Sequence, residues 1–190
     1  MSYDLYLVRV PPGADPTDAA REFIESQEEV DDTALRVDSS GTDVRTLAPQ
    51  LLALNPALEP FKPDFAEIAR ASGTTEAEAR ASFRHVEINT PESAGTGIQI
   101  TLYECHASVT VPYWHQGSAA TAVWAEIWLY LDALERAGGL RTFDTQLDRV
   151  LDLATDLPAV VDSYGGGATA CASLAAQINA TPRRPWWKFW

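Results

Sequence analysis

Cysteine is scarce in this chain of 190 residues, which contains only Cys105 and Cys171. Small secreted proteins that depend on a disulfide framework carry more cysteines, so this class is excluded. The chain also lacks any stretch near the about 20 apolar residues that a membrane-spanning helix needs. Its first six residues have neither the basic segment nor the apolar run of a signal peptide. We therefore expect a cytoplasmic protein.

Motifs that mark catalytic and nucleotide-binding sites are missing as well. The chain contains no Gly-rich phosphate loop between a strand and a helix, no Gly-x-Ser-x-Gly motif and no pair of metal ligands at a characteristic spacing. The three consecutive glycines at 165–167 follow an expected helix, which is the wrong position for a phosphate loop. We therefore assign no catalytic residue, no metal ligand and no cofactor.

Basic residues are also few, because 14 Lys and Arg stand against 27 Asp and Glu and the net charge is −13. Nucleic-acid binding through a basic surface is disfavoured, whereas an acidic surface attracts a basic protein partner. The charge is uneven along the chain. Residues 1–43 contain eleven acids and three arginines, whereas residues 168–190 contain Arg183, Arg184, Lys188 and no acid. We expect an acidic body followed by a basic tail.

The pattern over residues 97–114 predicts the β-hairpin around which the fold is organised. Side chains alternate between the two faces of a strand. With a two-residue turn at Glu104 and Cys105, this alternation separates the apolar from the polar side chains of the segment without exception. One face then carries only the apolar side chains Ile98, Ile100, Leu102, Ala107, Val109 and Val111. The other carries only Gln99, Thr101, Tyr103, His106, Ser108 and Thr110. A shift by one residue would pair apolar with polar side chains, so the pattern also predicts the register.

Other periodicities place the hairpin in an α+β fold. Further strands are expected at residues 3–10, 84–89 and 140–144, and apolar residues recur at helical spacing over 118–137. Caps and prolines indicate a helical insertion at about 43–83, in which Thr75 and Glu78 have the spacing of a capping box. We expect an antiparallel sheet of about 4–5 strands with the helix at 118–137 packed on one face. A short helix at 157–164, closed by the three glycines, should end a single domain of residues 1–167.

The polar face of the hairpin, extended by the strand at 84–89, is the first candidate site. It presents His85, Glu87, Gln99, Thr101, Tyr103, His106 and Ser108, a set suited to recognition of another protein. An alternative is a small-molecule or hydrolytic site, with or without a metal ion, built from His85, Glu87 and His106. A solvated sheet face, or a face covered by the helices of 43–83, explains the same pattern without any function.

Two pairs of neighbouring residues receive a structural interpretation. Cys105 and His106 resemble a nucleophile and its base, but alternation along a strand directs their side chains to opposite faces. Trp114 and His115 lie where the hairpin leads into the long helix, and we expect packing and capping there; a ligand pocket is the alternative.

The tail of residues 168–190 differs in composition from the rest of the chain, and it ends in the sequence WWKFW. Trp186, Trp187 and Trp190 are candidate partner-binding residues. Tryptophan together with cations also suits a membrane interface, so weak membrane contact by the tail is one alternative. Packing on the body or on a second copy of the chain is another, and the oligomeric state is left open.

Four segments of the chain resemble an uncharacterised family of small bacterial cytosolic proteins. They are residues 1–6 (MSYDLY), 97–102 (GIQITL), 111–115 (VPYWH) and 142–147 (TFDTQL). The resemblance covers about residues 1–164 and implies no activity and no site residues. Small acidic proteins of this style are similar to immunity proteins of bacterial toxin systems. The first hypothesis is therefore a non-enzymatic, acidic protein-binding module, an immunity-like or adaptor protein, and the second is the enzyme described above.

Overall fold

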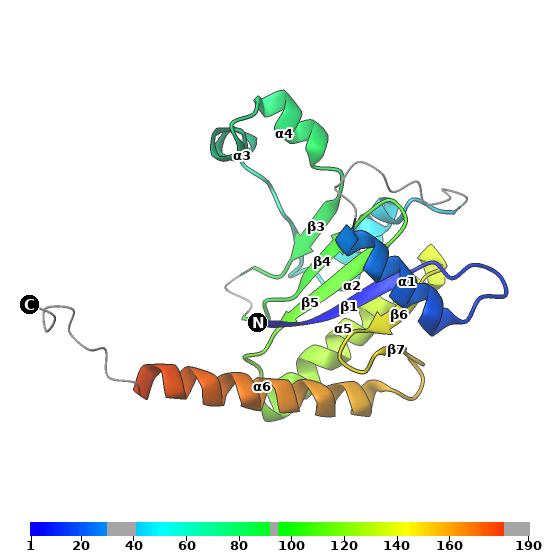
Figure 1. Cartoon of the computed structure of the whole chain (residues 1–190), viewed down its shortest axis with the longest axis vertical. Helices are drawn as coiled ribbons and strands as arrows, with labels where there is room; N and C mark the ends of the chain where they lie inside the picture. The colour runs from blue at the N-terminus through cyan, green and yellow to red at the C-terminus, as the bar shows by residue number, and fades with distance from the viewer. Residues whose placement is uncertain (30–40, 92–94, 181–190) are drawn as a thin grey trace, which may run out of the picture.

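The computed structural model describes residues 1–29, 41–91 and 95–180 (Figure 1). The strands are β1 (Ser2–Val8), β2 (Glu59–Pro60), β3 (Val86–Asn89), β4 (Gln99–Leu102), β5 (Ala107–Pro112), β6 (Arg141–Asp144) and β7 (Arg149–Val150). The helices are α1 (Pro16–Glu29), a 3-10 turn η1 (Val44–Leu47), α2 (Ala48–Leu54), α3 (Phe65–Ser72), α4 (Glu76–Ser82), α5 (Gly117–Gly138) and α6 (Leu157–Ala180).

The strands form one antiparallel sheet in the order β2-β3-β4-β5-β1-β6-β7. The prediction of an α+β fold is confirmed, but the described chain has seven strands where 4–5 were expected. The two additional strands, β2 and β7, have two residues each and lie at the edges of the sheet. A two-residue strand is too short to show alternation, which explains why the sequence pattern missed both. Short edge strands also limit pairing with other chains.

The predicted hairpin register is confirmed at each pair of β4 and β5. Gln99 lies opposite Thr110, and Leu102 lies opposite Ala107. The amide of Tyr103 donates to the carbonyl of His106 at 2.9 Å, which closes the two-residue turn. Strand β1 pairs with β5 on one side and with β6 on the other, so the N-terminal strand is internal, as the apolar side chains on both of its faces predicted.

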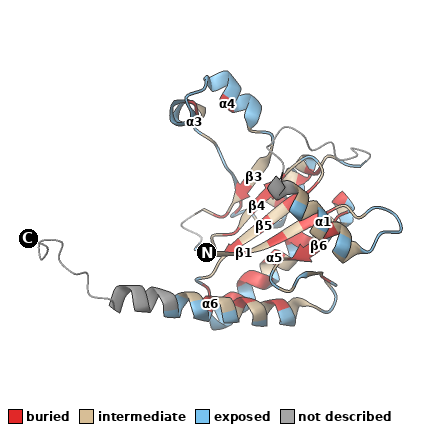
Figure 2. Ribbon diagram, in the orientation of Figure 1, coloured by how far each residue is buried: buried red, intermediate tan, exposed pale blue. Residues whose placement is uncertain are grey.

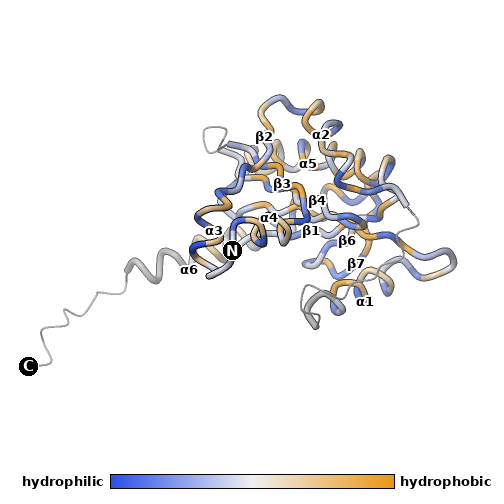
Figure 3. Tube along the Cα trace, turned by 90° about the horizontal axis from the view of Figure 1, so that it is seen from above, coloured by the Kyte–Doolittle hydropathy of each residue, from blue (hydrophilic) through white to orange (hydrophobic). Residues whose placement is uncertain are grey.

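The apolar face of the sheet belongs to the main core. Trp124 and Ile127 of α5 are fully buried in the cluster that contains Leu5, Ile100 and Val109. Figure 3 shows α2 and α5 on one side of the sheet and α1 on the other. Buried positions recur along β1, β4, β5 and α5, as Figure 2 shows. The ring of Tyr3 meets that of Trp124 edge to face, with 5.1 Å between their centroids.

Residues 43–83 form the expected helical insertion, which also contributes strand β2 to the sheet. The carboxylate of Asp64 accepts from the amide of Glu67 and caps α3. The capping box predicted from Thr75 and Glu78 is confirmed at the start of α4. In Figure 1, α3 and α4 project from the end of the sheet that contains β3.

The prediction that a helix ends at residue 164 is wrong, because α6 continues to Ala180. The absence of a side chain at Gly167 allows the Tyr113 ring to approach α6 closely, because a Cβ atom there would lie 2.4 Å from Cε1 of Tyr113. Ala168, the next residue, is buried in the main core, so the packed body extends past 167. The second half of α6 stands clear of the sheet in Figure 1. Among the described helices, none has the length and apolar character needed to cross a membrane.

Candidate functional site

The sheet gathers polar side chains from five strands on the face opposite the main core. Residues directly opposite each other in antiparallel strands share a face, so the register defines rows across it. The first row is Glu59, Asn89, Gln99, Thr110 and Asp4. The second row is Glu87, Thr101, Ser108 and Tyr6, and the third is His85, Tyr103 and His106. We call these residues the polar face.

All seven candidate residues predicted on the sheet lie on the polar face, but they are less exposed than an open platform would make them. Thr101 is 7% exposed and His106 is 9% exposed. The ring of Phe23 in α1 lies 5.0 Å from that of His106 and covers it. Phe23 of α1 therefore covers His106, whereas Phe83, at the end of α4 in the segment 43–83, contacts His85.

Aromatic and imidazole rings run in contact along the third row. Phe83 lies 4.0 Å from His85, whose ring is 5.4 Å from that of Tyr103. Tyr103 in turn stacks on His106 at 4.2 Å with an angle of 9°. Tyr103 thus contacts both imidazoles. Across the described ranges, no three His, Cys, Asp or Glu side chains are grouped so that they could hold a metal ion.

Burial controls the protonation state of His106. Removal from water disfavours the charged imidazolium and lowers the pKa of His106 to about 4, so the ring is neutral near pH 7. On the same row, Nε2 of His85 lies 4.0 Å from Oε2 of Glu87. The predicted group of His85, Glu87 and His106 therefore consists of one loose pair and one separate, neutral and buried ring.

The prediction that Cys105 and His106 point apart is wrong. Sγ of Cys105 lies 3.6 Å from Nδ1 of His106. Cys105 lies in the turn between β4 and β5, where the alternation of a strand does not apply. Burial raises the pKa of the Cys105 thiol, which disfavours the thiolate that a cysteine nucleophile needs. The contact between the two side chains is therefore real, but it does not create an activated nucleophile.

Two cavities meet at Asn89, at the end of the polar face that carries the first row. One has a volume of about 490 Å³ and is lined by Glu59, Pro60, Phe61, Lys62, Asn89 and Pro91. The other has a volume of about 300 Å³ and is lined by Asn89, Thr90, Gly95, Gly97, Ile98, Gln99 and Trp114. We call this pair of hollows the Asn89 cavities. Phe61 is 46% exposed and Trp114 is 63% exposed, so each cavity is bordered by an exposed aromatic ring.

The Trp114 side chain is held in place although it is exposed. Its indole N–H donates to Nε2 of the buried His115 at 2.9 Å. The same nitrogen lies 2.7 Å from the Thr96 carbonyl. Nε2 accepts from Trp114 when it carries no proton, and it donates to Thr96 in the tautomer that has the proton on Nε2. The indole also packs on Gly97, where a Cβ would lie 2.4 Å from Cζ2 of the ring. The sequence predicts packing at Trp114, with a ligand pocket as the alternative, and gives no signal for Phe61, because exposure depends on the neighbours that the fold supplies.

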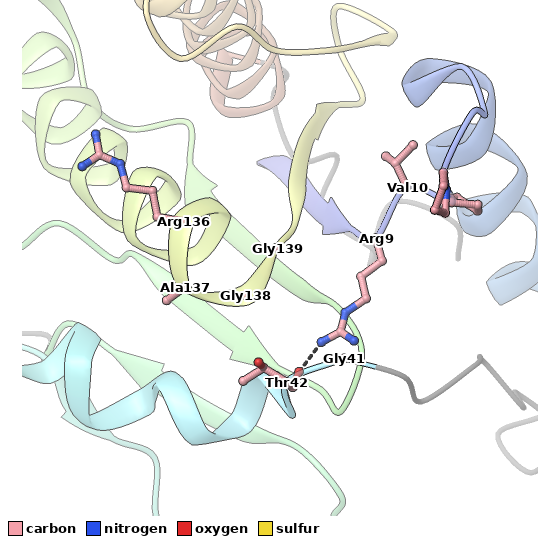
Figure 4. Close-up of a pocket in the computed structure, with 10 residues that line it drawn as sticks. Arg9, Val10, Gly41, Thr42, Arg136, Ala137, Gly138 and Gly139 are labelled. Atoms are coloured by element: carbon pink, nitrogen blue, oxygen red, sulfur yellow. Dashed lines mark hydrogen bonds between the residues drawn. The ribbon is translucent and has the colours of Figure 1, made fainter.

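Another hollow lies elsewhere and brings few reactive groups together. Its volume is about 600 Å³, and it lies between the end of β1, residues 41–42 and the end of α5 (Figure 4). The guanidinium of Arg9 donates to the Thr42 carbonyl, while Arg136 points away from it and pairs with Asp132 at 2.8 Å. Among the described residues that line it, none carries a carboxylate, an imidazole or a thiol. We therefore place the candidate site at the polar face and the Asn89 cavities.

The remaining candidate residues, Trp186, Trp187 and Trp190, lie outside the described residues. No family model, no curated protein and no solved structure matches the chain. The resemblance to a family of small bacterial cytosolic proteins stays a prediction.

Proposed function

We propose that this chain is a non-enzymatic binding protein of the cytoplasm that engages a basic protein through its polar face. The role that fits best is that of an immunity-like or adaptor protein in a bacterial toxin system. The observation that carries the proposal is the charge of the polar face. It contains the carboxylates of Asp4, Glu59 and Glu87 and neither lysine nor arginine. Such a face attracts a partner with the opposite charge.

The hydrogen bonds within the polar face support a recognition surface that is ordered before binding. Thr110 donates to Asp4 at 2.9 Å, and Asn89 donates to Glu87 at 2.7 Å. These bonds hold the carboxylates at defined positions, so a partner loses less conformational entropy on binding. The rings of Phe61 and Trp114 add large contact areas at the rim, and aromatic residues of this kind dominate the energy of many interfaces.

The enzyme hypothesis has weaker support. The buried, neutral His106 contacts Tyr103 and Phe23 rather than an open cavity, and its ring shares no hydrogen bond with His85 or Glu87 in the described structure. A general base must lie within hydrogen-bonding reach of the group that it serves. The proposal therefore gives His85, Glu87, Gln99, Thr101, Tyr103, His106 and Ser108 a place in a binding surface. The tail tryptophans Trp186, Trp187 and Trp190 stay candidates for a second contact.

The proposal is tested by reversing the charge of the polar face. Gln99→Arg places a cation in the middle of the first row, and Ala125→Arg places the same side chain on the exposed surface of α5 as a matched control. Tagged full-length proteins, each checked for folding by circular dichroism, are incubated with extracts of the source cells. We expect a basic protein to be retained by the original chain and by the Ala125→Arg variant, and to be released by salt. Equal retention by the Gln99→Arg variant would contradict the proposal.

A further inference from the structure

We propose that the Asn89 cavities accept an arginine side chain of the partner. The inference rests on the proposed binding function and specifies which group of a basic protein the polar face recognises. It is carried by three features that meet at Asn89: two carboxylates, two aromatic rings and a buried oxygen that lacks a donor.

The carboxylates lie on either side of Asn89. Glu59 is directly opposite Asn89 across the β2–β3 pair, and Oε1 of Glu87 accepts from Nδ2 of Asn89 at 2.7 Å. The Glu87 side chain is 16% exposed, so its charge is only partly screened by water. A planar guanidinium binds carboxylates through parallel N–H···O bonds, which favours arginine over other cations in such a setting.

Each cavity has one aromatic ring in its wall, and Glu59 is the carboxylate that lines the larger cavity together with Phe61. Phe61 lines the larger cavity and Trp114 the smaller one. The backbone N–H of Phe61 donates to the Glu87 carbonyl at 2.8 Å, and the Trp114 indole is held by His115 and Gly97. Guanidinium groups stack on exposed tryptophan and phenylalanine rings through cation–π attraction. Because the Phe61 backbone and the Trp114 indole are held in place, these parts of the site need little ordering when a cation enters.

The buried oxygen is Oδ1 of Asn89. Among the described residues it has no hydrogen-bond donor and no contact with solvent, while Nδ2 of the same amide is occupied by Glu87. A buried acceptor without a donor is unfavourable, and a ligand that supplies the donor relieves that cost. This oxygen is closed off from the cavity, so a guanidinium, which carries five N–H donors and no acceptor, bonds it together with a carboxylate once the Asn89 side chain turns toward the ligand.

Lys62 also lines the larger cavity, so its substitution provides a second test of the arginine site. Its ammonium repels an incoming guanidinium. Removal of this charge with Lys62→Gln should therefore strengthen binding of an arginine ligand, whereas removal of a carboxylate with Glu59→Gln should weaken it. A distant carboxylate provides the matched control: Glu104 lies in the turn at the other end of the hairpin and has a 63% exposed side chain.

The experiment is a titration of the full chain, labelled with ¹⁵N in its tryptophan indoles, with the peptide acetyl-Gly-Arg-Gly-amide. The same peptide with citrulline in place of arginine keeps the shape and removes the charge. We expect the Trp114 indole resonance, identified by its loss in Trp114→Phe, to shift with the arginine peptide only. Lys62→Gln should lower the dissociation constant and Glu59→Gln should raise it, each by about threefold, with no change for Glu104→Gln.

Three outcomes would overturn the inference: no shift of Trp114 at millimolar peptide, equal shifts with citrulline, or equal effects of Glu59→Gln and Glu104→Gln. Its failure is distinguishable from that of the binding function. If the peptide does not bind but Gln99→Arg still abolishes capture of a basic protein, the polar face is an interface without an arginine site. If the peptide binds but capture is insensitive to Gln99→Arg, the arginine site stands without the proposed interface.

Discussion

Replacement of Gly167 by alanine should destabilise the protein, although the same change inside a helix normally stabilises it. Gly165, Gly166 and Gly167 all lie within α6, and the first two have no neighbour within 4 Å of an added Cβ. At Gly167, however, the added Cβ would lie 2.4 Å from Cε1 and 2.8 Å from Cζ of Tyr113. The Tyr113 ring stacks on the buried Tyr164 with 5.3 Å between centroids, which limits its freedom to withdraw.

The expected change in the free energy of unfolding is the sum of two opposing effects. Alanine is favoured over glycine inside a helix by about 0.5–1 kcal/mol. An extra methyl group forced into a filled space costs about 1–3 kcal/mol. Gly166→Ala should therefore raise the free energy of unfolding by about 0.5–1 kcal/mol, whereas Gly167→Ala should lower it by about 0.5–2 kcal/mol. Two changes of identical chemistry at adjacent positions thus have opposite signs.

Urea unfolding followed by circular dichroism measures both free energies. A third background, Tyr113→Ala, removes the ring that the added methyl group meets, and there Gly167→Ala should become neutral or stabilising. The difference between the two backgrounds is the coupling between the positions. If Gly166→Ala and Gly167→Ala stabilise the protein equally, α6 does not approach the Tyr113 ring as closely as described.

Two further predictions concern buried polar groups. Because burial lowers the folded-state pKa of His106 to about 4 from an unfolded value near 6.5, the unfolded chain binds more protons between these values, and stability falls as pH decreases through that range. The free energy of unfolding should fall by about 2 kcal/mol less in His106→Phe than in the original chain between pH 7 and pH 5, as measured by urea unfolding at both pH values. A His106 imidazole that titrates near pH 6.5 by NMR in the folded protein would contradict this. Tyr3→Phe removes the hydroxyl that donates to the buried Asp144 at 2.6 Å, and should cost about 1–3 kcal/mol of unfolding free energy. An unchanged urea midpoint for this variant would show that the Asp144 carboxylate finds another donor.

The sequence pattern predicts which residues lie on the polar face, but not how exposed they are. Alternation in the hairpin was sufficient to place Gln99 and Thr101 on one face, because facing is a local property of a strand. It could not predict the burial of His106 on the same face, because that depends on Phe23 of α1. Nor could it identify the Asn89 cavities, whose walls come from residues 59–62, 89–91, Gly95, 97–99 and Trp114.

Turns and glycines were the positions where local rules failed. Cys105 follows turn geometry rather than strand alternation, and its thiol therefore meets the imidazole of His106. Glycines at 165–167 have the composition of a helix end, yet α6 passes through them because Gly167 allows the Tyr113 ring to approach. In both cases the deciding interaction is made by a side chain whose position a periodic pattern does not specify.

The sequence by itself determined the α+β class, the hairpin register, the long helix α5 and the capping box of α4. These features depend on interactions between residues close in the chain, or on a period that either matches a helix or a strand or does not. Only the tertiary structure decided which polar side chains are buried, which aromatic rings remain exposed and which carboxylates meet at Asn89. Burial and charge clustering depend on contacts between segments far apart in the sequence, and those contacts exist only once the sheet has brought five strands together on one face.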